Sequence, residues 1–179
     1  MIVHPREDKM KIFALFFLSF TTILASGQEQ FAIDEQGLTP KSISSSFESD
    51  SKEQLYEKII SWLEKTEEHK IEVGETAINE KIHFDLFKGN AVSLADRYYN
   101  AKYVIQINCE DGKYTIQPTK IFLKVNSKYD MGWKEFSISD ASEFFKKGKV
   151  IRKYKAYLQD LTTPLNDFQN ALQSHLIDK

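Results

Sequence analysis

The chain has 179 residues, of which 41% are hydrophobic and 28% charged, with 7 Gly, 4 Pro and a single Cys. These values exclude a collagen-like or low-complexity polymer, a small disulfide-stapled protein and a membrane protein with several spans, and they predict one domain around a single core. The formal net charge is -2, so the chain as a whole lacks the positive field that drives binding to nucleic acid.

The N-terminal segment has the pattern of a secretory signal peptide. Met10 and Lys11 precede an uncharged apolar stretch, residues 12–24, which is followed by the small residues 25–27. A positive start, a short apolar segment and a small-residue cleavage site are the three parts of such a signal. The stretch is also shorter than the ~20 apolar residues that a transmembrane helix needs.

We therefore expect a signal peptide over residues 1–27, cleavage after Gly27 and a single α+β domain over residues 28–179. Translation starts either at Met1 or at Met10. The mature protein is expected in the periplasm or outside the cell. In such an oxidising compartment the lone Cys109 has no internal disulfide partner, so stability has to come from packing.

Residues 31–47 predict a first strand followed by a loop, because short apolar spots alternate with Gly37, Pro40 and four serines. We interpret the Ser-rich run as a strand edge that leads into a helix cap, with a modified linker as the alternative.

The clearest helix begins at Asp50 and Ser51. Glu53 and Gln54 follow them at the spacing of a capping box. Apolar residues then recur at spacings of three and four, which predicts a helix to about Glu67 with one face on a sheet. These apolar residues are Leu55, Tyr56, Ile59, Ile60, Trp62 and Leu63.

The middle of the chain is predicted to be β-sheet. Ile82, Phe84 and Leu86 alternate with polar residues, as in a strand with one buried face. Asp111-Gly112 supplies the positive φ values of a type I′ hairpin turn. That turn pairs Cys109 with Tyr114, Asn108 with Thr115, Ile107 with Ile116 and Gln106 with Gln117, and it sets Glu110 opposite Lys113.

The second hairpin strand continues through Ile121, Leu123 and Val125. Pro118 lacks an N–H and predicts a bulge or an edge there. A last strand is expected over residues 133–138.

Two helices are expected in the C-terminal part. A short one begins at Asp140 and runs to Gly148. In the longer one, apolar residues recur at spacings of four and three, and packing on the chain's own sheet is favoured over a coiled-coil seam because Pro164 interrupts the run. Thr163 is expected to restart a second helical piece. The apolar residues are Tyr154, Leu158, Leu161, Leu165, Phe168 and Leu172.

Several local strings resemble a bacterial family known as domain of unknown function 4468, which has a TBP-like fold and is common in exported Bacteroidota proteins. The strings are Gly37-Leu38-Thr39-Pro40, Ser51-Lys52-Glu53-Gln54-Leu55-Tyr56 with Trp62 beyond it, and Tyr103 to Tyr114. They span roughly residues 31–125, with a weaker echo in 166–172. The resemblance implies an antiparallel β-sheet with helices packed on one face, and it implies no activity.

The motifs of the common catalytic classes do not occur. There is no G-x-S-x-G elbow, P-loop, H-E-x-x-H or C-x-x-C, and no cofactor or metal is predicted. Cys109 is expected to be a buried, inert thiol. The potential metal ligands form two small sets. Neither is expected to complete a metal site, since zinc usually takes at least three ligands from the protein. They are His69, Glu72 and Glu75, and separately His83 and Asp85.

Two groups of residues are candidates for binding. The first is a basic cluster interleaved with aromatic residues: Lys146, Lys147, Lys149, Arg152, Lys153 and Lys155. It either faces an anionic lipid or polysaccharide or is a solvated helix face, and the second interpretation is favoured. The second is an aromatic set that can stack on sugars or anchor a partner, although aromatic residues near loops more often close the end of a core: Tyr98, Tyr99, Tyr129 and Trp133.

The leading hypothesis is a non-enzymatic envelope protein that binds an envelope protein or glycan and no nucleic acid. The alternative is peripheral docking on an anionic surface through the basic cluster. A third hypothesis, a hydrolase with scattered acids, requires a deep pocket that holds two or more carboxylates.

Overall fold

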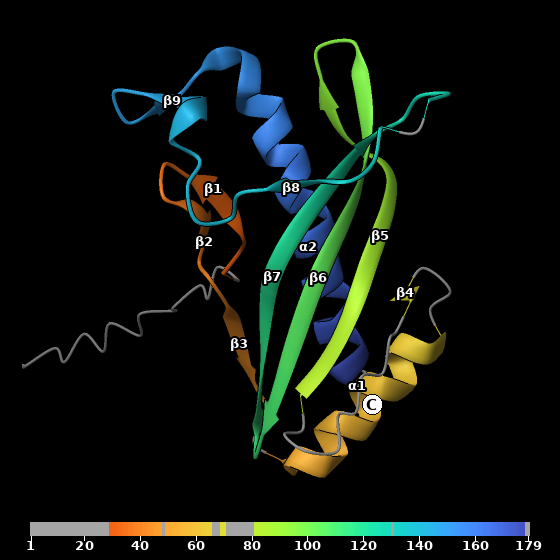
Figure 1. The fold of residues 1–179 in the computed structure, drawn as a ribbon. Helices are drawn as coiled ribbons and strands as arrows, with labels where there is room; N and C mark the ends of the chain where they lie inside the picture. The colour runs from red at the N-terminus through yellow and green to blue at the C-terminus, as the bar shows by residue number, and fades with distance from the viewer. Residues whose placement is uncertain (1–28, 48, 66–68, 71–80, 130, 178–179) are drawn as a thin grey trace, which may run out of the picture.

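A six-stranded antiparallel sheet forms the body of the protein (Figure 1). The structure, a computed structural model, describes residues 29–47, 49–65, 69–70, 81–129 and 131–177. In spatial order the strands are β3 (Ile43–Ser46), β7 (Lys113–Val125), β6 (Arg97–Glu110), β5 (Lys81–Leu94) and β4 (His69–Lys70), and β8 (Lys134–Phe136) also pairs with β7. The predicted signal peptide lies outside the described residues.

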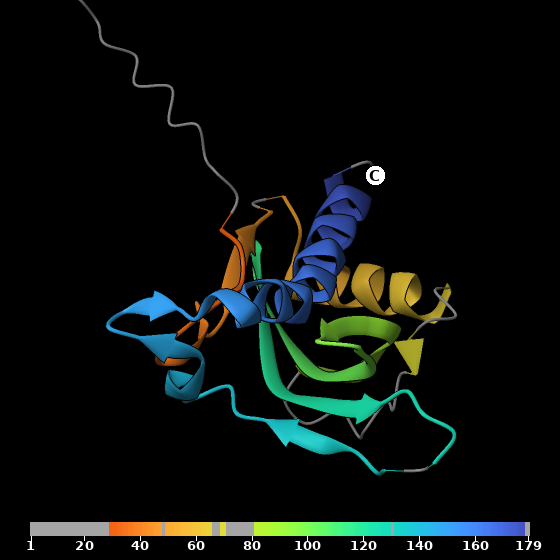
Figure 2. The same ribbon diagram turned by 90° about the horizontal axis from the view of Figure 1, so that it is seen from above.

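Two helices, α1 (Lys52–Lys65) and α2 (Lys155–Ile177), cover the same face of this sheet (Figures 1 and 2). Their buried residues belong to one hydrophobic cluster with those of β5, β6 and β7. The predicted α+β fold with helices on one face is therefore confirmed. We call the helix-covered face the inner face and the opposite one the outer face.

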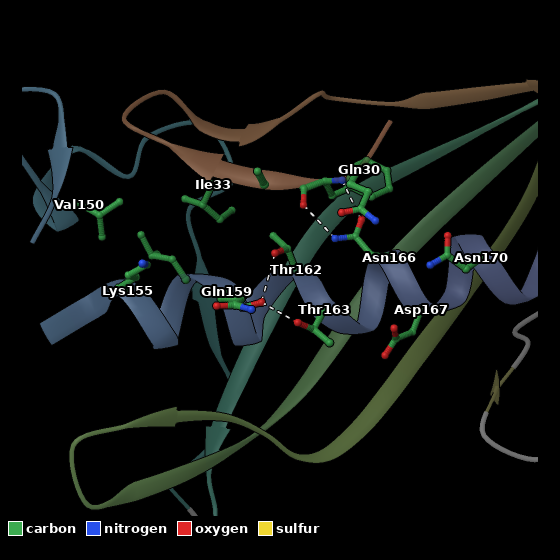
Figure 3. A pocket seen from close by; sticks show the side chains of 13 residues that line it. Gln30, Ile33, Val150, Lys155, Gln159, Thr162, Thr163, Asn166, Asp167 and Asn170 are labelled. Carbon is green, nitrogen blue, oxygen red and sulfur yellow. Dashed lines mark hydrogen bonds between the residues drawn. The ribbon is translucent and has the colours of Figure 1, made fainter. Parts of the chain in front are cut away.

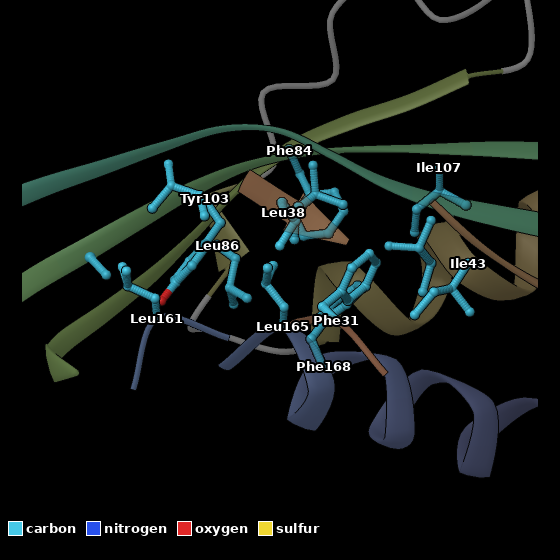
Figure 4. Close-up of a cluster of buried hydrophobic side chains, with 14 of the residues drawn as sticks. Phe31, Leu38, Ile43, Phe84, Leu86, Tyr103, Ile107, Leu161, Leu165 and Phe168 are labelled. Carbon is cyan, nitrogen blue, oxygen red and sulfur yellow. The ribbon is translucent and has the colours of Figure 1, made fainter. Parts of the chain in front are cut away.

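Figure 4 shows how three parts of the chain meet in this core. The N-terminal strands contribute Phe31, Leu38 and Ile43. The sheet contributes Phe84, Leu86, Tyr103 and Ile107, and α2 contributes Leu161, Leu165 and Phe168. All ten side chains are buried. The predicted apolar stripe of the last helix thus packs on the chain's own sheet.

The predicted hairpin register is confirmed at every pair. β6 and β7 set Cys109 opposite Tyr114 and Gln106 opposite Gln117, and Lys113 forms an ion pair of 2.8 Å with Glu110 beside the turn. The expected irregularity at Pro118 is present as well, because the register shifts where Pro118 faces Ile105. The two-residue loop and the strand alternation agree here, which is why the register could be predicted. The predicted type I′ turn is wrong, because Gly112 has a positive φ of +68° whereas Asp111 does not.

The cap of α1 also follows the prediction. The Ser51 N–H donates to Gln54 Oε1 at 2.8 Å, and the Gln54 N–H donates to Ser51 Oγ at 3.3 Å, which is a capping box. Asp50 accepts an ion pair from Lys58 at 2.8 Å instead of capping. The described part of the helix runs to Lys65, and the expected end at about Glu67 lies outside the described residues.

Residues 31–47 form three strands where one was predicted. β1 (Ala32–Asp34) and β2 (Gly37–Thr39) make a small hairpin, and β3 pairs with the edge of β7. The Ser-rich run is the strand edge that the sequence indicated, since Ser44 Oγ and Thr115 Oγ1 lie 2.8 Å apart across β3 and β7.

The expected helix over residues 140–148 is wrong. Only η2 (Ser142–Phe144) is helical, and β9 (Phe145–Lys146) and β10 (Lys149–Val150) form a hairpin, which η3 (Arg152–Tyr154) follows. Lys147 and Gly148 take φ values of +53° and +73°, as a tight hairpin turn requires. The Gly148 N–H is held by Glu35 Oε1 at 3.3 Å.

The expected break at Pro164 is wrong as well, because α2 continues through it. Pro164 is buried in the packed face of the helix, so tertiary contacts offset the hydrogen bond that proline cannot donate. In the same turn the hydroxyls of Thr162 and Thr163 both donate to the Gln159 carbonyl, at 3.2 and 3.0 Å.

Candidate functional site

A row of large side chains crosses the outer face of the sheet. Phe87 on β5 lies directly opposite Lys102 on β6, Lys102 lies opposite Phe122 on β7, and Phe122 lies opposite Glu135 on β8. Residues directly opposite one another in a sheet project to the same side. The row therefore brings two phenyl rings and a cation together on the face away from the helices.

Trp133, just before β8, completes this group. Its ring meets the ring of Phe87 edge-on, with centroids 6.1 Å apart at 81°. The Lys102 ammonium lies 5.1 Å from the Phe122 ring centroid and 5.9 Å from that of Trp133, within the range of cation–π attraction. We call Phe87, Lys102, Phe122 and Trp133 the outer-face cluster.

Lys102 fixes the geometry of the cluster, because it is held from two sides. Its Nζ forms an ion pair of 3.3 Å with Asp85 Oδ2 while it faces the two rings. The rings themselves remain accessible, since Phe87 is 43% and Trp133 38% exposed. Exposed apolar side chains that gather on one face mark interaction sites more often than singly scattered ones.

The structure separates the four aromatic residues that the sequence singled out. Trp133 belongs to the outer-face cluster. Tyr98 is 60% exposed and alternates with Tyr99 along β6, so the two project from opposite faces. Tyr129 is 66% exposed in the loop between β7 and β8. Tyr99 lines a cleft on the inner side.

Sequence reasoning missed Phe87, Lys102 and Phe122. A signal was present, since each phenylalanine directly follows a buried residue, Leu86 or Ile121. Two adjacent apolar residues break the alternation of a half-buried strand. The second residue of such a pair has to lie on the solvent face.

The cleft at the end of the sheet has a volume of about 420 Å³ and an aromatic lining. Tyr99, Phe136, Phe144 and Tyr157 line it, and the ring centroids of Phe136 and Phe144 lie 5.8 Å apart. The pKa of Tyr157 is raised, first by burial and then by the neighbouring Tyr99 and Glu143. Tyr157 therefore remains a neutral hydrogen-bonding group in this cleft.

Three acidic residues, Glu135, Asp140 and Glu143, also contribute to the lining of the cleft, although the side chain of Glu135 projects to the outer face opposite Phe122. This is the feature that the hydrolase hypothesis requires. A general acid in glycoside cleavage needs a raised pKa, but the pKa of Asp140 is lowered by hydrogen bonds from the backbone and side chain of Ser142. Asp140 is thus an anchor for η2 and poorly suited to donate a proton.

The basic cluster lies on the hairpin β9–β10 and the residues that follow it, so the favoured interpretation of a helix face is wrong for its first three members. The hairpin projects from the body of the protein (Figure 2). Its six cations are all exposed, and none forms an ion pair with a described residue. They are Lys146, Lys147, Lys149, Arg152, Lys153 and Lys155.

A second hollow, of about 470 Å³, lies between β1 and α2 (Figure 3). Its floor contains an unusual link, because the Asn166 side chain bonds to both main-chain groups of Phe31. The Phe31 N–H donates to Asn166 Oδ1 at 2.8 Å, and Asn166 Nδ2 donates to the Phe31 carbonyl at 3.0 Å. We call this hollow the β1 groove.

Cys109 is buried on the inner face beside Ile107 and Tyr114, as predicted. Burial raises the pKa of its thiol from 9.0 to about 11, so the thiolate that acts as a nucleophile is scarce at neutral pH. Tyr103 is also fully buried, and its hydroxyl has no hydrogen-bond partner in the described part of the chain.

Within the described residues, no group of three His, Cys, Asp or Glu side chains is placed to hold a metal ion. Glu72 and Glu75 lie outside these residues, and of His69 only the backbone of β4 is described. Neither helix in the described part of the chain is long and apolar enough to cross a membrane.

Two solved structures share this fold. A domain of unknown function 4468 family protein from Bacteroides ovatus superposes with a TM-score of 0.51 at 16% identity, over 76% of this chain and 82% of its own. A TBP-like protein from Parabacteroides distasonis gives a TM-score of 0.50 at 18% identity, over 75% and 88%. The fold that the sequence resemblance implied is thus confirmed. In sequence, no family model and no curated protein matches the chain.

Proposed function

We propose that this chain is an exported, non-enzymatic binding module that holds a protein or glycan of the cell envelope against the outer face of its sheet. The observation that carries the proposal is the outer-face cluster, whose two rings, Phe87 and Trp133, are exposed and yet held in a defined geometry. The signal-peptide pattern of residues 1–27 supports the location.

The cluster has the properties of an interaction hot spot. Large aromatic residues dominate binding energy at interfaces, because they bury much area with few torsions to restrict. Here the rings are also ordered before binding, since Lys102 faces both Phe122 and Trp133. A partner therefore meets a surface that loses little conformational entropy on association.

The test is capture from envelope extract by the immobilised mature protein. The double variant Phe87→Ala/Trp133→Ala should retain the captured partner at least thirtyfold less well than the parent protein, because the loss of a single hot-spot ring already costs about 2 kcal/mol or more. The readout is mass spectrometry of the retained material, with glycan staining for a non-protein partner.

His83→Ala/Gln117→Ala is the matched control, since both residues are exposed on the outer face but lie outside the cluster. This variant should retain the partner as the parent does. Equal retention by all three proteins would contradict the proposal.

N-terminal sequencing of the protein from the producing cells tests export. The sequence should begin at Gln28, and a chain that still carries the segment from Met10 would contradict export.

A second candidate function is docking on an anionic lipid surface through the hairpin β9–β10. The observation that favours it is the set of six exposed cations on and beside a projecting hairpin. Each cation near an anionic membrane contributes about 1 kcal/mol. Phe145 and Tyr154, both half-buried, set the hairpin against the body of the protein.

Replacing Lys146, Lys147 and Lys149 by glutamate should lower the partition coefficient onto anionic liposomes at least about a hundredfold at low salt, because three contributions of about 1 kcal/mol are lost. Co-sedimentation measures this, and binding by the parent protein should fall steeply as salt rises. A triple variant Lys41→Glu/Lys65→Glu/Lys120→Glu, with the same change in net charge, should keep most of the binding. Equal loss in both triple variants would show that net charge alone acts.

A further inference from the structure

One edge of β1 pairs with β2, and the other faces α2. The Leu38 N–H on β2 donates outward to the Ile138 carbonyl at 2.9 Å, so the opposed pair Ile33 and Leu38 is not hydrogen-bonded across the ladder. In an antiparallel pair such residues direct their N–H and C=O groups to the outer edges. The main-chain groups of Ile33 therefore point away from β2.

The residues two positions before and after Ile33 have partners for three of their four main-chain groups. At Phe31 the Asn166 carboxamide bonds to both the N–H and the carbonyl, and at Glu35, in the turn after β1, the carbonyl accepts the Ala141 N–H at 3.2 Å. The N–H and carbonyl of Ile33 have no partner within the described residues. They are the one gap in the outer edge of β1 as described.

This gap faces the β1 groove. Ile33 lines the groove beside Val150 and Lys155, while Asn166 and Asn170 lie toward its other end (Figure 3). Lys155 is exposed and forms no ion pair with a described residue. The open donor and acceptor of Ile33 thus lie next to an unpaired cation, and the remaining cations of the basic cluster extend beyond it.

We infer that the β1 groove binds an extended acidic segment of a partner protein, with the N–H and C=O of one of its residues paired to Ile33 and a carboxylate paired to Lys155. A residue of an extended segment fits because its C=O and N–H point to the same side and supply the acceptor and the donor that Ile33 lacks. A simple anion does not fit as well, because it satisfies the N–H but meets the carbonyl oxygen with like charge.

Asn166 limits how far such a segment can pair. Its carboxamide already fills the edge at Phe31, so the added segment forms a ladder of one residue and then leaves along the groove. Lys155 and the other cations of the basic cluster determine selectivity, because they attract acidic segments and repel basic ones. This inference concerns the helix side of the sheet and does not depend on the outer-face cluster.

The test uses the mature protein and a blocked peptide, acetyl-Val-Glu-Val-Glu-Val-amide, followed by nuclear magnetic resonance. In the free protein the Ile33 amide should exchange with solvent at least tenfold faster than the amides of Ala32 and Asp34, which point toward β2. Saturating peptide should slow the Ile33 exchange at least tenfold. The counterpart with lysine in place of glutamate should bind at least tenfold more weakly.

Ile33→Pro removes the donor and leaves the β2-facing groups intact, since an edge strand tolerates proline where the N–H points outward. It should weaken peptide binding at least tenfold, whereas Ile33→Val, which keeps the N–H, should bind within twofold of the parent. If Ile33→Pro does not fold, Lys155→Glu, an exposed position, should weaken binding at least tenfold in its place. An Ile33 amide already protected in the free protein, or shifts confined to another surface, would overturn the inference.

Discussion

Replacing Phe168 by alanine should lower the free energy of unfolding by about 3–5 kcal/mol, the usual cost of emptying a buried phenylalanine site. Phe168 contacts Trp62 of α1 at a centroid distance of 5.5 Å and Phe84 of β5 at 5.1 Å. It thus joins both helices to the sheet, and its two ring neighbours come from different elements that cannot both move in to fill the cavity.

Chemical denaturation followed by circular dichroism measures this change. Phe168→Leu is the matched control and should cost only about 1–1.5 kcal/mol, because most of the buried volume is kept. A loss below about 1 kcal/mol for the alanine variant would show that α2 is not packed on the sheet as described.

Gly37→Ala should cost about 3 kcal/mol or more, for two separable reasons. Gly37 has φ of +96°, and a Cβ there would lie 2.6 Å from the carbonyl carbon of Ile138 and 2.8 Å from the Ser139 nitrogen. Both neighbours are backbone, so the β1–β2 hairpin has to move away from residues 138–139. The hydrogen bond between the Leu38 N–H and the Ile138 carbonyl is then lost as well.

Gly132→Ala separates the two causes. Gly132 also has a positive φ, +67°, but a Cβ there meets nothing within 4 Å. Only the backbone strain remains, which costs about 1 kcal/mol. Thermal unfolding of both variants checks the difference. Equal losses in the two proteins would mean that the contact between Gly37 and Ile138 is looser than described.

The parts of this fold that could be predicted are those where local chemistry decides the outcome. Asp111-Gly112 and the alternation beside it determine the register of β6 and β7, and Ser51 with Gln54 determines the start of α1. In each case turn or cap preference and hydrophobic pattern agree. The resemblance in sequence and the two similar structures then support the same arrangement.

Two wrong predictions, a helix over residues 140–148 and a break at Pro164, concern places where contacts between residues distant in sequence determine the structure. Nothing within residues 140–150 indicates that Glu35 holds the Gly148 N–H, which stabilises a hairpin where a helix was expected. Pro164 was expected to break α2, but its burial against the core offsets the lost hydrogen bond. Neither contact can be inferred from the secondary-structure propensities of the neighbouring residues.

The candidate site was predicted only in part, for the same reason. Trp133 could be singled out as an aromatic residue near a loop, but its partners Phe87 and Lys102 are distant in sequence and meet it only through the register of four strands. The β1 groove depends on the link between Asn166 and Phe31, which lie 135 positions apart. No local pattern connects them.

Photo-cross-linking in the producing cells tests most directly whether the outer face is the binding surface. A benzophenone side chain is introduced in place of Phe87, and separately in place of Glu57, which is exposed on α1. We expect a discrete adduct from position 87 that disappears when Trp133→Ala is added, and none from position 57. Equal adducts from both positions, or an adduct from position 57 alone, would contradict it.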